Sequence, residues 1–272
     1  LYMKVLAFGD IFGRWGRRAL KAALPWLMEQ FHPDFIIANT ENLTHGKWPS
    51  IDHLNDLQTN GVDIFMWGNH LFTKKDEIFE YLDRPDSLQL RPANHFSSSY
   101  FSYPGSGYRI FTKGDKRLLA INLMSGVFLK DQMDNPFLVV DRILSEQAGK
   151  YDACVIDFHR ETTAELVCMA EWVKGRASLV YGTHTHVQTN DERIIDGGTA
   201  MMTDIGMTGP IHSAIGQDFE SRIAGFVSGS GAFAIKPVPM EHGPMVVTWV
   251  FVDIDAMGRA THIEKIRITS DE

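Results

Sequence analysis

The sequence has few cysteines. Only Cys154 and Cys168 are present among 272 residues, and they form no C-x-x-C motif. Both lie in apolar segments, so we predict two buried free thiols rather than a disulfide. This composition favours a protein of the reducing cytoplasm.

The sequence also lacks a long apolar run and an excess of basic residues. No stretch approaches the ~20 apolar residues that a membrane-spanning helix needs, and the first residues have no signal-peptide layout. The net charge of -8 argues against a general nucleic-acid-binding surface. We therefore expect no membrane partner and no stable nucleic-acid complex. A small phosphate ester is compatible with this charge, because bound metal ions reverse the local field.

Internal repeats, linkers and low-complexity tracts are missing too, and we predict one domain over residues 1–272. Apolar runs and helical periodicities alternate along the chain. Strands are predicted at 3–8, 35–38, 62–67, 118–123, 153–156, 178–180 and 200–203, and helices at 17–31, 51–60, 75–82, 137–147 and 163–174. This alternation favours an α/β fold whose parallel or mixed sheet is covered by helices on both faces.

Three further segments complete the chain. Residues 85–114 are rich in Ser, Tyr, Pro and Gly, which predicts loops with room for one short strand. The glycine-rich residues 225–231 have little periodicity and are predicted to form a mobile loop. Residues 246–255 and 261–268 alternate between apolar and polar on either side of a turn, which predicts an antiparallel hairpin.

The most informative stretch is YGTHTHV at residues 181–187. It places His184 and His186 directly after the apolar run at 178–180. If that run is a β-strand, both side chains point the same way just past its end, since side chains alternate along a strand. Two neutral imidazoles aimed at one point suit a transition metal, although a strand end with two solvated histidines would have the same pattern.

Four further apolar runs also end in polar side chains. In open α/β sheets the binding crevice lies beyond the carboxyl ends of the strands, so donors at five strand ends would meet at one edge. Each has an ordinary alternative: Asp10 could cap a helix, Glu41 could be a loop carboxylate, Asn69 could hold a turn and His159 could be a core histidine. Their joint placement favours a metal site. Its predicted ligands are Asp10, Glu41, Asn42, Asn69, His159, His184 and His186.

Seven donors exceed the four ligands of a single structural zinc ion, which predicts two ions. Carboxylate, amide and imidazole donors without thiolate are the set that Mn²⁺, Fe and catalytic Zn²⁺ use. A carboxylate can bridge two ions that act on phosphorus, and Glu41, central in the strand series, is the predicted bridge. His70 would project above the site as proton donor to a leaving alkoxide, the alternative being a structural turn histidine.

These residues resemble the calcineurin-like metallophosphoesterases through GNH at 68–70 and GTHTH at 182–186. The finer pattern is similar, nearly end to end, to the YmdB family of bacterial phosphodiesterases. The motifs that carry this similarity are FGDIFG at 8–13, EN at 41–42, HGK at 45–47, RPAN at 91–94, IDFH at 156–159, THTHVQT at 183–189 and DIGMTGP at 204–210.

The resemblance implies a four-layer α/β/β/α metallophosphoesterase sandwich with mixed sheets around a dinuclear centre. It implies a cyclic-nucleotide phosphodiesterase, with 2′,3′-cyclic AMP among its substrates and iron or manganese as its metal, zinc or magnesium being alternatives. Matched by position, the first ion would have the ligands Asp10, Glu41, Asn42 and His186. The second would have Glu41, Asn69, His159 and His184, and the proton donor would be His70.

Two departures from the wider pattern bear on this assignment. The superfamily opens with Asp-x-His, whereas Asp10-Ile11-Phe12 has no histidine, and Glu41 stands where most members have a bridging Asp; both features match the YmdB branch. Relatives usually place Thr-Trp-Asp after the histidine at 70, whereas this chain has Leu71-Phe72-Thr73, which bears on substrate preference and rate. His212 is predicted to be a surface histidine, with a place in the pocket wall as the alternative.

The predicted mechanism is attack of a metal-bridging hydroxide on phosphorus, in line with the leaving ribose oxygen, which His70 protonates. Two alternatives stay open at this point. One is a phosphomonoesterase or protein phosphatase with the same centre, and the other is a nucleotide-binding regulatory protein with little turnover. A small phosphodiester is the expected partner, and a homo-oligomer is compatible with the sequence.

Overall fold

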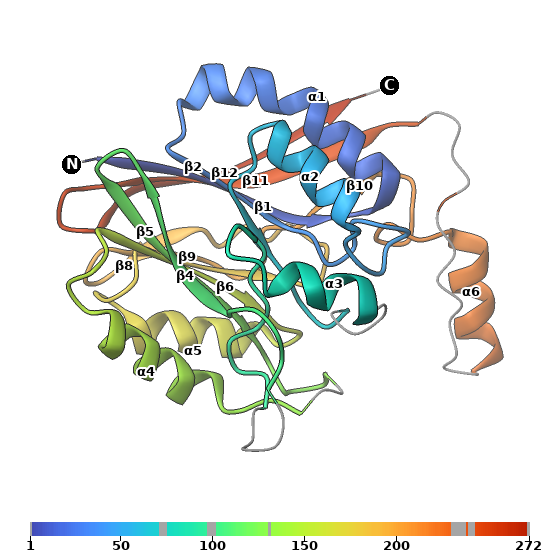
Figure 1. Ribbon diagram of the computed structural model, residues 1–272. Coiled ribbons are helices and arrows are strands. Elements are labelled where there is room, and N and C mark those ends of the chain that lie inside the picture. Colours follow the sequence, from blue (N-terminus) through green and yellow to red (C-terminus); the bar gives the residue numbers. More distant parts are fainter. Residues whose placement is uncertain are drawn as a thin grey trace.

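Two six-stranded sheets pack face to face and carry helices on their outer faces, so the fold has four layers (Figure 1). The computed structural model describes residues 2–70, 75–96, 102–129, 132–229, 238 and 243–270. The predicted α/β/β/α sandwich with mixed sheets is confirmed. The hairpin predicted near the end of the chain is confirmed as well, and it joins the first sheet.

The first sheet has the strand order β12-β11-β10-β1-β2-β3. Its strands are β1 (Met3–Ile11), β2 (Phe35–Asn39), β3 (Ile64–Met66), β10 (Met207–Pro210), β11 (Met245–Ile254) and β12 (Ala260–Ser270). β1 pairs parallel with β2 and β10, whereas β11 pairs antiparallel with β1, β10 and β12. The helices α1 (Gly13–Phe31), α2 (Ile51–Thr59) and α3 (Lys75–Leu82) pack on its outer face.

The second sheet has the strand order β4-β5-β6-β7-β9-β8. Its strands are β4 (Tyr108–Lys113), β5 (Lys116–Met124), β6 (Ala153–His159), β7 (Leu179–Thr183), β8 (Arg193–Ile195) and β9 (Thr199–Met202). The central strands β5, β6, β7 and β9 are parallel, and the outer strands β4 and β8 are antiparallel. The helices α4 (Pro136–Gln147) and α5 (Thr163–Val173) cover the face that points away from the first sheet (Figure 1).

Both faces of the central strands are buried, which explains their unbroken apolar runs. Along β1, Leu6 and Phe8 pack against the helices, whereas Val5 and Ala7 pack against the second sheet. The layer between the sheets also includes Tyr181 of β7. Strands that are fixed on both faces hold their carboxyl ends rigidly, and these ends carry the predicted site.

The glycine-rich segment at 225–231 was predicted to be a mobile loop, and this is wrong for residues 225–228. They belong to α6 (Phe219–Ser228), which stands away from the four layers (Figure 1). The carboxylate of Asp218 caps the first turn by accepting from the Ser221 N–H at 2.8 Å, and Gly229 ends the helix at φ 60. Both signals are local, and they outweigh the weak periodicity. Residues 230 and 231 lie outside the described part of the chain.

The two cysteines lie in different environments. Cys154 is buried on β6, as predicted, but Cys168 is exposed, so the prediction of a second buried thiol is wrong. The buried side of α5 consists of Leu166, Met169, Ala170 and Val173, and position 168 falls between them on the outward side. Both thiols are free.

We expect one of the two thiols to react with dithionitrobenzoate in the native protein. Cys168 is accessible, whereas burial raises the pKa of the Cys154 thiol and keeps the reagent out. Absorbance should show one equivalent of reaction at once and the second only after denaturation. A Cys168→Ser variant should lose the first phase, and two rapid equivalents in wild type would contradict the fold.

Among the described residues, no helix combines the length and the apolar character that crossing a membrane requires.

Candidate metal centre

The seven predicted ligands lie at the carboxyl ends of strands from both sheets. They were expected at one edge of one sheet, and this is wrong, because the two facing sheets each contribute a part. The first sheet supplies every carboxylate and amide donor: Asp10 at the end of β1, Glu41 and Asn42 after β2, and Asn69 after β3. The second supplies every imidazole: His159 at the end of β6, and His184 and His186 after β7.

The Nε2 atom of His159 is the meeting point of one group of donors. It lies 2.9 Å from Asn69 Oδ1, 3.0 Å from His184 Nδ1 and 3.3 Å from Glu41 Oε1. A ring nitrogen carries at most one proton, so it cannot satisfy three acceptors. Donor atoms of Glu41, His159 and His184 all lie within 4.8 Å of one another. Several lone pairs that converge in this way fit a cation better than a hydrogen.

A second group lies beside the first. Asn42 Oδ1 is 3.1 Å from His186 Nε2, and the other ring nitrogen of His186 donates to the Ile215 carbonyl at 2.9 Å. Asp10 lies beside the first group, because its Oδ2 accepts from the His184 N–H at 3.1 Å. Its Oδ1 is buried and has no hydrogen-bond partner within the described residues. A buried carboxylate oxygen without a donor is costly, and a cation would compensate it.

The two histidines after β7 do not continue the strand. β7 ends at Thr183, and His184 and His186 have φ angles of 108 and 63. The argument from side-chain alternation is therefore wrong, although both imidazoles do reach the site. His184 turns toward His159, and His186 turns toward Asn42. Positive φ is uncommon for residues other than glycine, and such strain concentrates at functional sites.

A buried polar network fixes the orientation of His159. The Thr183 hydroxyl donates to Asp157 Oδ1 at 2.7 Å and lies 2.9 Å from His159 Nδ1. Because its only proton goes to Asp157, the hydroxyl accepts from the Nδ1–H of His159. Asn39 holds the other Asp157 oxygen at 3.2 Å. With Nδ1 held in this way, the Nε2 atom of His159 faces the site, where its lone pair could bind a cation.

His184 has a similar partner. Its Nε2 lies 3.1 Å from the Glu161 carboxylate, which leaves Nδ1 to face the other donors. Sequence reasoning missed Glu161, Asp157 and Thr183, because each supports a predicted ligand, directly or through Thr183, and is not itself a predicted ligand. Their closeness in sequence to His159 and His184 was the available signal.

Burial and the charges within the group set the protonation states. Burial raises the pKa of Asp10 well above its ordinary value, and the charge of Glu41 adds to this. Burial would also raise the pKa of Glu41, but the facing His159, with His70 and His184, outweighs it and holds that pKa low. Burial would lower the pKa of His159, but Glu41 raises it to about 9. Burial and His159 together lower the pKa of His184 to about 3.

Gly68 lies directly against this group. A Cβ atom there would lie 2.3 Å from both Glu41 Oε2 and His159 Nε2. Real Cβ contacts are far longer, so any side chain at this position would displace two donors. The GNH motif thus has a glycine at this position because no side chain fits there, and not because the backbone needs a positive φ.

His70 borders the same site. Its backbone N–H donates to Glu41 Oε2 at 3.3 Å, and it lines a cavity of about 290 Å³ together with Asn42 and His186. His212, predicted to be a surface histidine, is exposed. Residues 71–73, whose sequence departs from the family pattern, lie outside the described residues.

The family model for YmdB-like proteins matches residues 6–266 of the chain. The chain belongs to the YmdB-like family. A protein of Bacillus subtilis (strain 168) named 2′,3′-cyclic-nucleotide 2′-phosphodiesterase is 38% identical over 272 residues, which cover 99% of this chain and 98% of the relative. The family assignment made from the motifs is confirmed.

Solved structures agree with the YmdB-like assignment. The crystal structure of a novel phosphatase from Mycoplasma pneumoniae has a TM-score of 0.89 at 31% identity and covers 100% of this chain and 95% of that one. A 5′-nucleotidase precursor from Thermus thermophilus has a TM-score of 0.59 at 12% identity, covering 100% of this chain and 55% of that one. The second likeness concerns the fold alone.

Proposed function

We propose that this YmdB-like protein is a metal-dependent phosphodiesterase that opens 2′,3′-cyclic nucleotides, 2′,3′-cyclic AMP among them, and that residues 1–272 form one such domain. Family membership and the names of the relatives support hydrolysis of phosphoric esters. The observation that carries the metal-dependent chemistry is the convergence of three acceptors on His159 Nε2.

The residues present fit two cations. One group contains Asn42 and His186, and the other contains Asn69, His159 and His184. Asp10, whose buried Oδ1 has no hydrogen-bond partner among the described residues, would join Asn42 and His186, as the family resemblance implies. Glu41 would serve both, since one of its oxygens lies 3.3 Å from His159 and it lines one cavity with Asn42 and His186. Oxygen and imidazole donors without thiolate favour iron or manganese, with zinc or magnesium as alternatives. Such a pair of ions, when bound, supplies a water of lowered pKa and neutralises charge on the phosphoryl oxygens.

The chain's own residues have separate tasks in this proposal. Glu161 and Thr183 orient the imidazoles of His184 and His159, so that their lone pairs face the site. His70, at the wall of the cavity, gives a proton to the ribose oxygen that leaves phosphorus. Proton donation to the leaving group is needed because an alkoxide is a poor leaving group at neutral pH.

His70→Ala should lower kcat for 2′,3′-cyclic AMP by about a hundredfold or more, the usual contribution of a positioned general acid. Metal content should stay at the wild-type level, because the hydrogen bond from position 70 to Glu41 comes from the backbone N–H, which alanine keeps. Elemental analysis and steady-state kinetics on the same sample check this. His212→Ala, which removes an exposed histidine, is the matched control. Unchanged kcat in His70→Ala would remove this residue from the mechanism.

A second candidate function is hydrolysis of phosphate monoesters, which the name of the Mycoplasma pneumoniae structure favours. Metal analysis of anaerobically purified protein, beside a screen of cyclic nucleotides, nucleoside monophosphates and phosphopeptides, separates the two. Cyclic nucleotides should have the highest kcat/KM. Faster cleavage of monoesters would replace the proposal, and tight nucleotide binding without turnover in Mn²⁺ or Fe²⁺ would favour a regulatory protein.

A further inference from the structure

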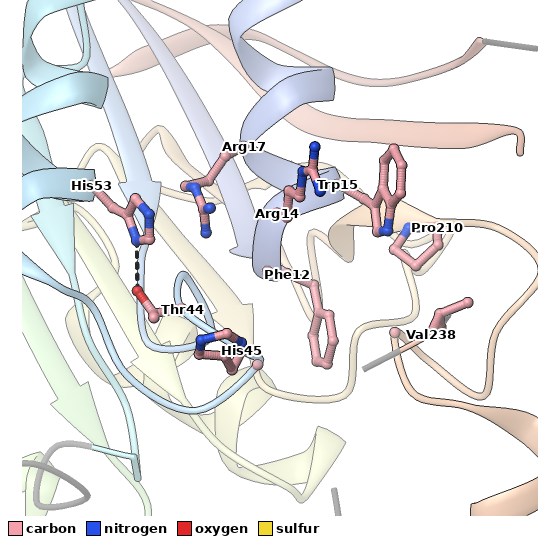
Figure 2. A pocket seen from close by; sticks show the side chains of 12 residues that line it. Phe12, Arg14, Trp15, Arg17, Thr44, His45, His53, Pro210 and Val238 are labelled. Atoms are coloured by element: carbon pink, nitrogen blue, oxygen red, sulfur yellow. Dashed lines mark hydrogen bonds between the residues drawn. The ribbon is translucent and has the colours of Figure 1, made fainter. Parts of the chain in front are cut away.

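A second cavity, of about 460 Å³, adjoins the candidate metal centre. It lies between the first turns of α1 and the segment after β2 (Figure 2). Phe12 and Gly46 line both this cavity and the one that holds Glu41 and His186. The two cavities therefore adjoin each other at Phe12 and Gly46.

The shared wall, Phe12, is firmly held. Its ring meets the His186 ring edge-on, with centroids 5.5 Å apart and an interplanar angle of 74°. A Cβ at Gly46 would lie 2.5 Å from the ring, and one at Gly216 would lie 2.6 Å from it. Both glycines have positive φ. The backbone at each of them lies close to the ring, so two segments hold it. The border between the two cavities is thus part of the fold.

The second cavity is basic. Arg14, Arg17, His45 and His53 line it, and its described lining contains no carboxylate, although the chain has a net charge of -8. Thr44 fixes His53 through its hydroxyl, 2.7 Å from Nδ1 (Figure 2). The positive charge comes from the two arginines, and Asp56 lies near Arg17 outside the described lining. Two guanidinium groups in a lining without a carboxylate favour an anionic ligand.

The arginines are placed for recognition. The Arg14 guanidinium carbon lies 5.6 Å from the Trp15 ring centroid, so the indole supports the charged group while Arg14 itself stays exposed. Arg17 is half-buried and donates to the Leu43 carbonyl, which fixes its position. Planar guanidinium groups bind phosphate through paired hydrogen bonds. The described lining of the cavity lacks the acidic donors of the metal centre, so it does not suit another cation.

We propose that this basic cavity binds a second phosphate group of the substrate, the one on the 5′ oxygen of the ribose that carries the cyclic phosphate. The inference rests on the proposed function, because the metal centre has to hold the cyclic phosphate. The second phosphate has two sources with the same chemistry. It is a terminal 5′-phosphate of a mononucleotide, or the internucleotide phosphate of a short RNA that ends in a cyclic phosphate.

The test compares three substrates of the metal-loaded protein. They are 2′,3′-cyclic AMP, its 5′-phosphorylated form, and the dinucleotide adenylyl-adenosine with a 2′,3′-cyclic end. A charge-assisted hydrogen bond changes affinity by about tenfold to a hundredfold, so kcat/KM should rise by at least about tenfold when a second phosphate is present. The substrate with the larger rise identifies the source. Equal kcat/KM for all three would overturn the inference.

In Arg14→Ala, the ratio of kcat/KM with the second phosphate to kcat/KM without it should fall toward one. In Arg142→Ala, this ratio should stay at the wild-type value. Arg142 is a matched control because it is an exposed arginine of α4 that pairs with Glu146. Arg14 is exposed, so its replacement should fold; Arg17→Lys, which keeps the charge but loses the planar fork, is the second variant. An Arg14→Ala protein with the full wild-type preference would contradict the assignment.

Calorimetry on chelator-treated protein separates this inference from the proposed function. Adenosine 5′-monophosphate should bind the metal-free wild type, and Arg14→Ala should weaken binding by about tenfold. If no cyclic substrate is hydrolysed, the proposed function fails and the calorimetry still decides on the cavity. Equal affinity in wild type and Arg14→Ala would refute the cavity as a phosphate site.

Discussion

Glu41→Gln should leave the protein with neither ion at full occupancy and with about a thousandfold lower phosphodiesterase activity, because bound metal supplies several kcal/mol at 1.36 kcal/mol per tenfold. The two oxygens of Glu41 face His159 and the His70 N–H. Glutamine has the same shape, but it replaces one of these oxygens with an NH₂ group that repels a cation. Glu41 lies against His159 and lines one cavity with Asn42 and His186, so its change should disturb both groups of donors.

The measurement is the number of metal ions per chain by elemental analysis, beside kcat/KM for 2′,3′-cyclic AMP. Glu171→Gln is the matched control, since it changes an exposed glutamate of α5 in the same way. The unfolding midpoint of the metal-free proteins shows whether the fold survives the change. Two ions bound at wild-type occupancy in Glu41→Gln would refute the bridging role.

Gly68→Ala should also lower the number of metal ions bound per chain, although it removes no donor. The added methyl group would lie 2.3 Å from Glu41 Oε2 and from His159 Nε2. Other contacts restrain both side chains, so neither can move away without cost. His159 is held by Thr183 and Asn69 on its two ring nitrogens. Overpacking of this kind costs about 1–3 kcal/mol of stability, and the displaced donors should lose their metal.

Metal content, activity and the unfolding midpoint should therefore all fall in Gly68→Ala. Gly126→Ala is the matched control, because a Cβ there would have open space around it and the residue is exposed. Equal loss in both variants would point to a general effect of the substitution. Full activity in Gly68→Ala would contradict the claim that a side chain at position 68 displaces Glu41 and His159.

The elements that could be predicted from sequence are those whose buried faces leave a regular apolar pattern. β1, β2 and β6 have continuous apolar runs, and α1 has a regular apolar spacing, since their neighbours demand it. β8 and β10 were missed, because β8 has three residues with two exposed ones, and β10 is a four-residue MTGP segment. α6 has no buried residue, so periodicity could not reveal it.

The donors of the candidate site could be named from their positions at strand ends, but their arrangement could not. Nothing in the local pattern of Asp10 or His159 says that they belong to different sheets. The split into two groups came from the resemblance to the family, and Thr183, Asp157 and Gly68 act through contacts that exist only after folding. Their closeness in the chain to His159, His184 and Asn69 was a signal, but it does not say which contacts they make.

The division of donors between the sheets has a consequence for the lifetime of the protein in the cell. Oxygen donors come from one sheet and imidazoles from the other. Each bound ion would therefore cross-link the two sheets. A ligand that binds only the folded chain stabilises it by mass action. Cells starved of the metal would then degrade this protein faster, and its abundance would follow the supply of that metal.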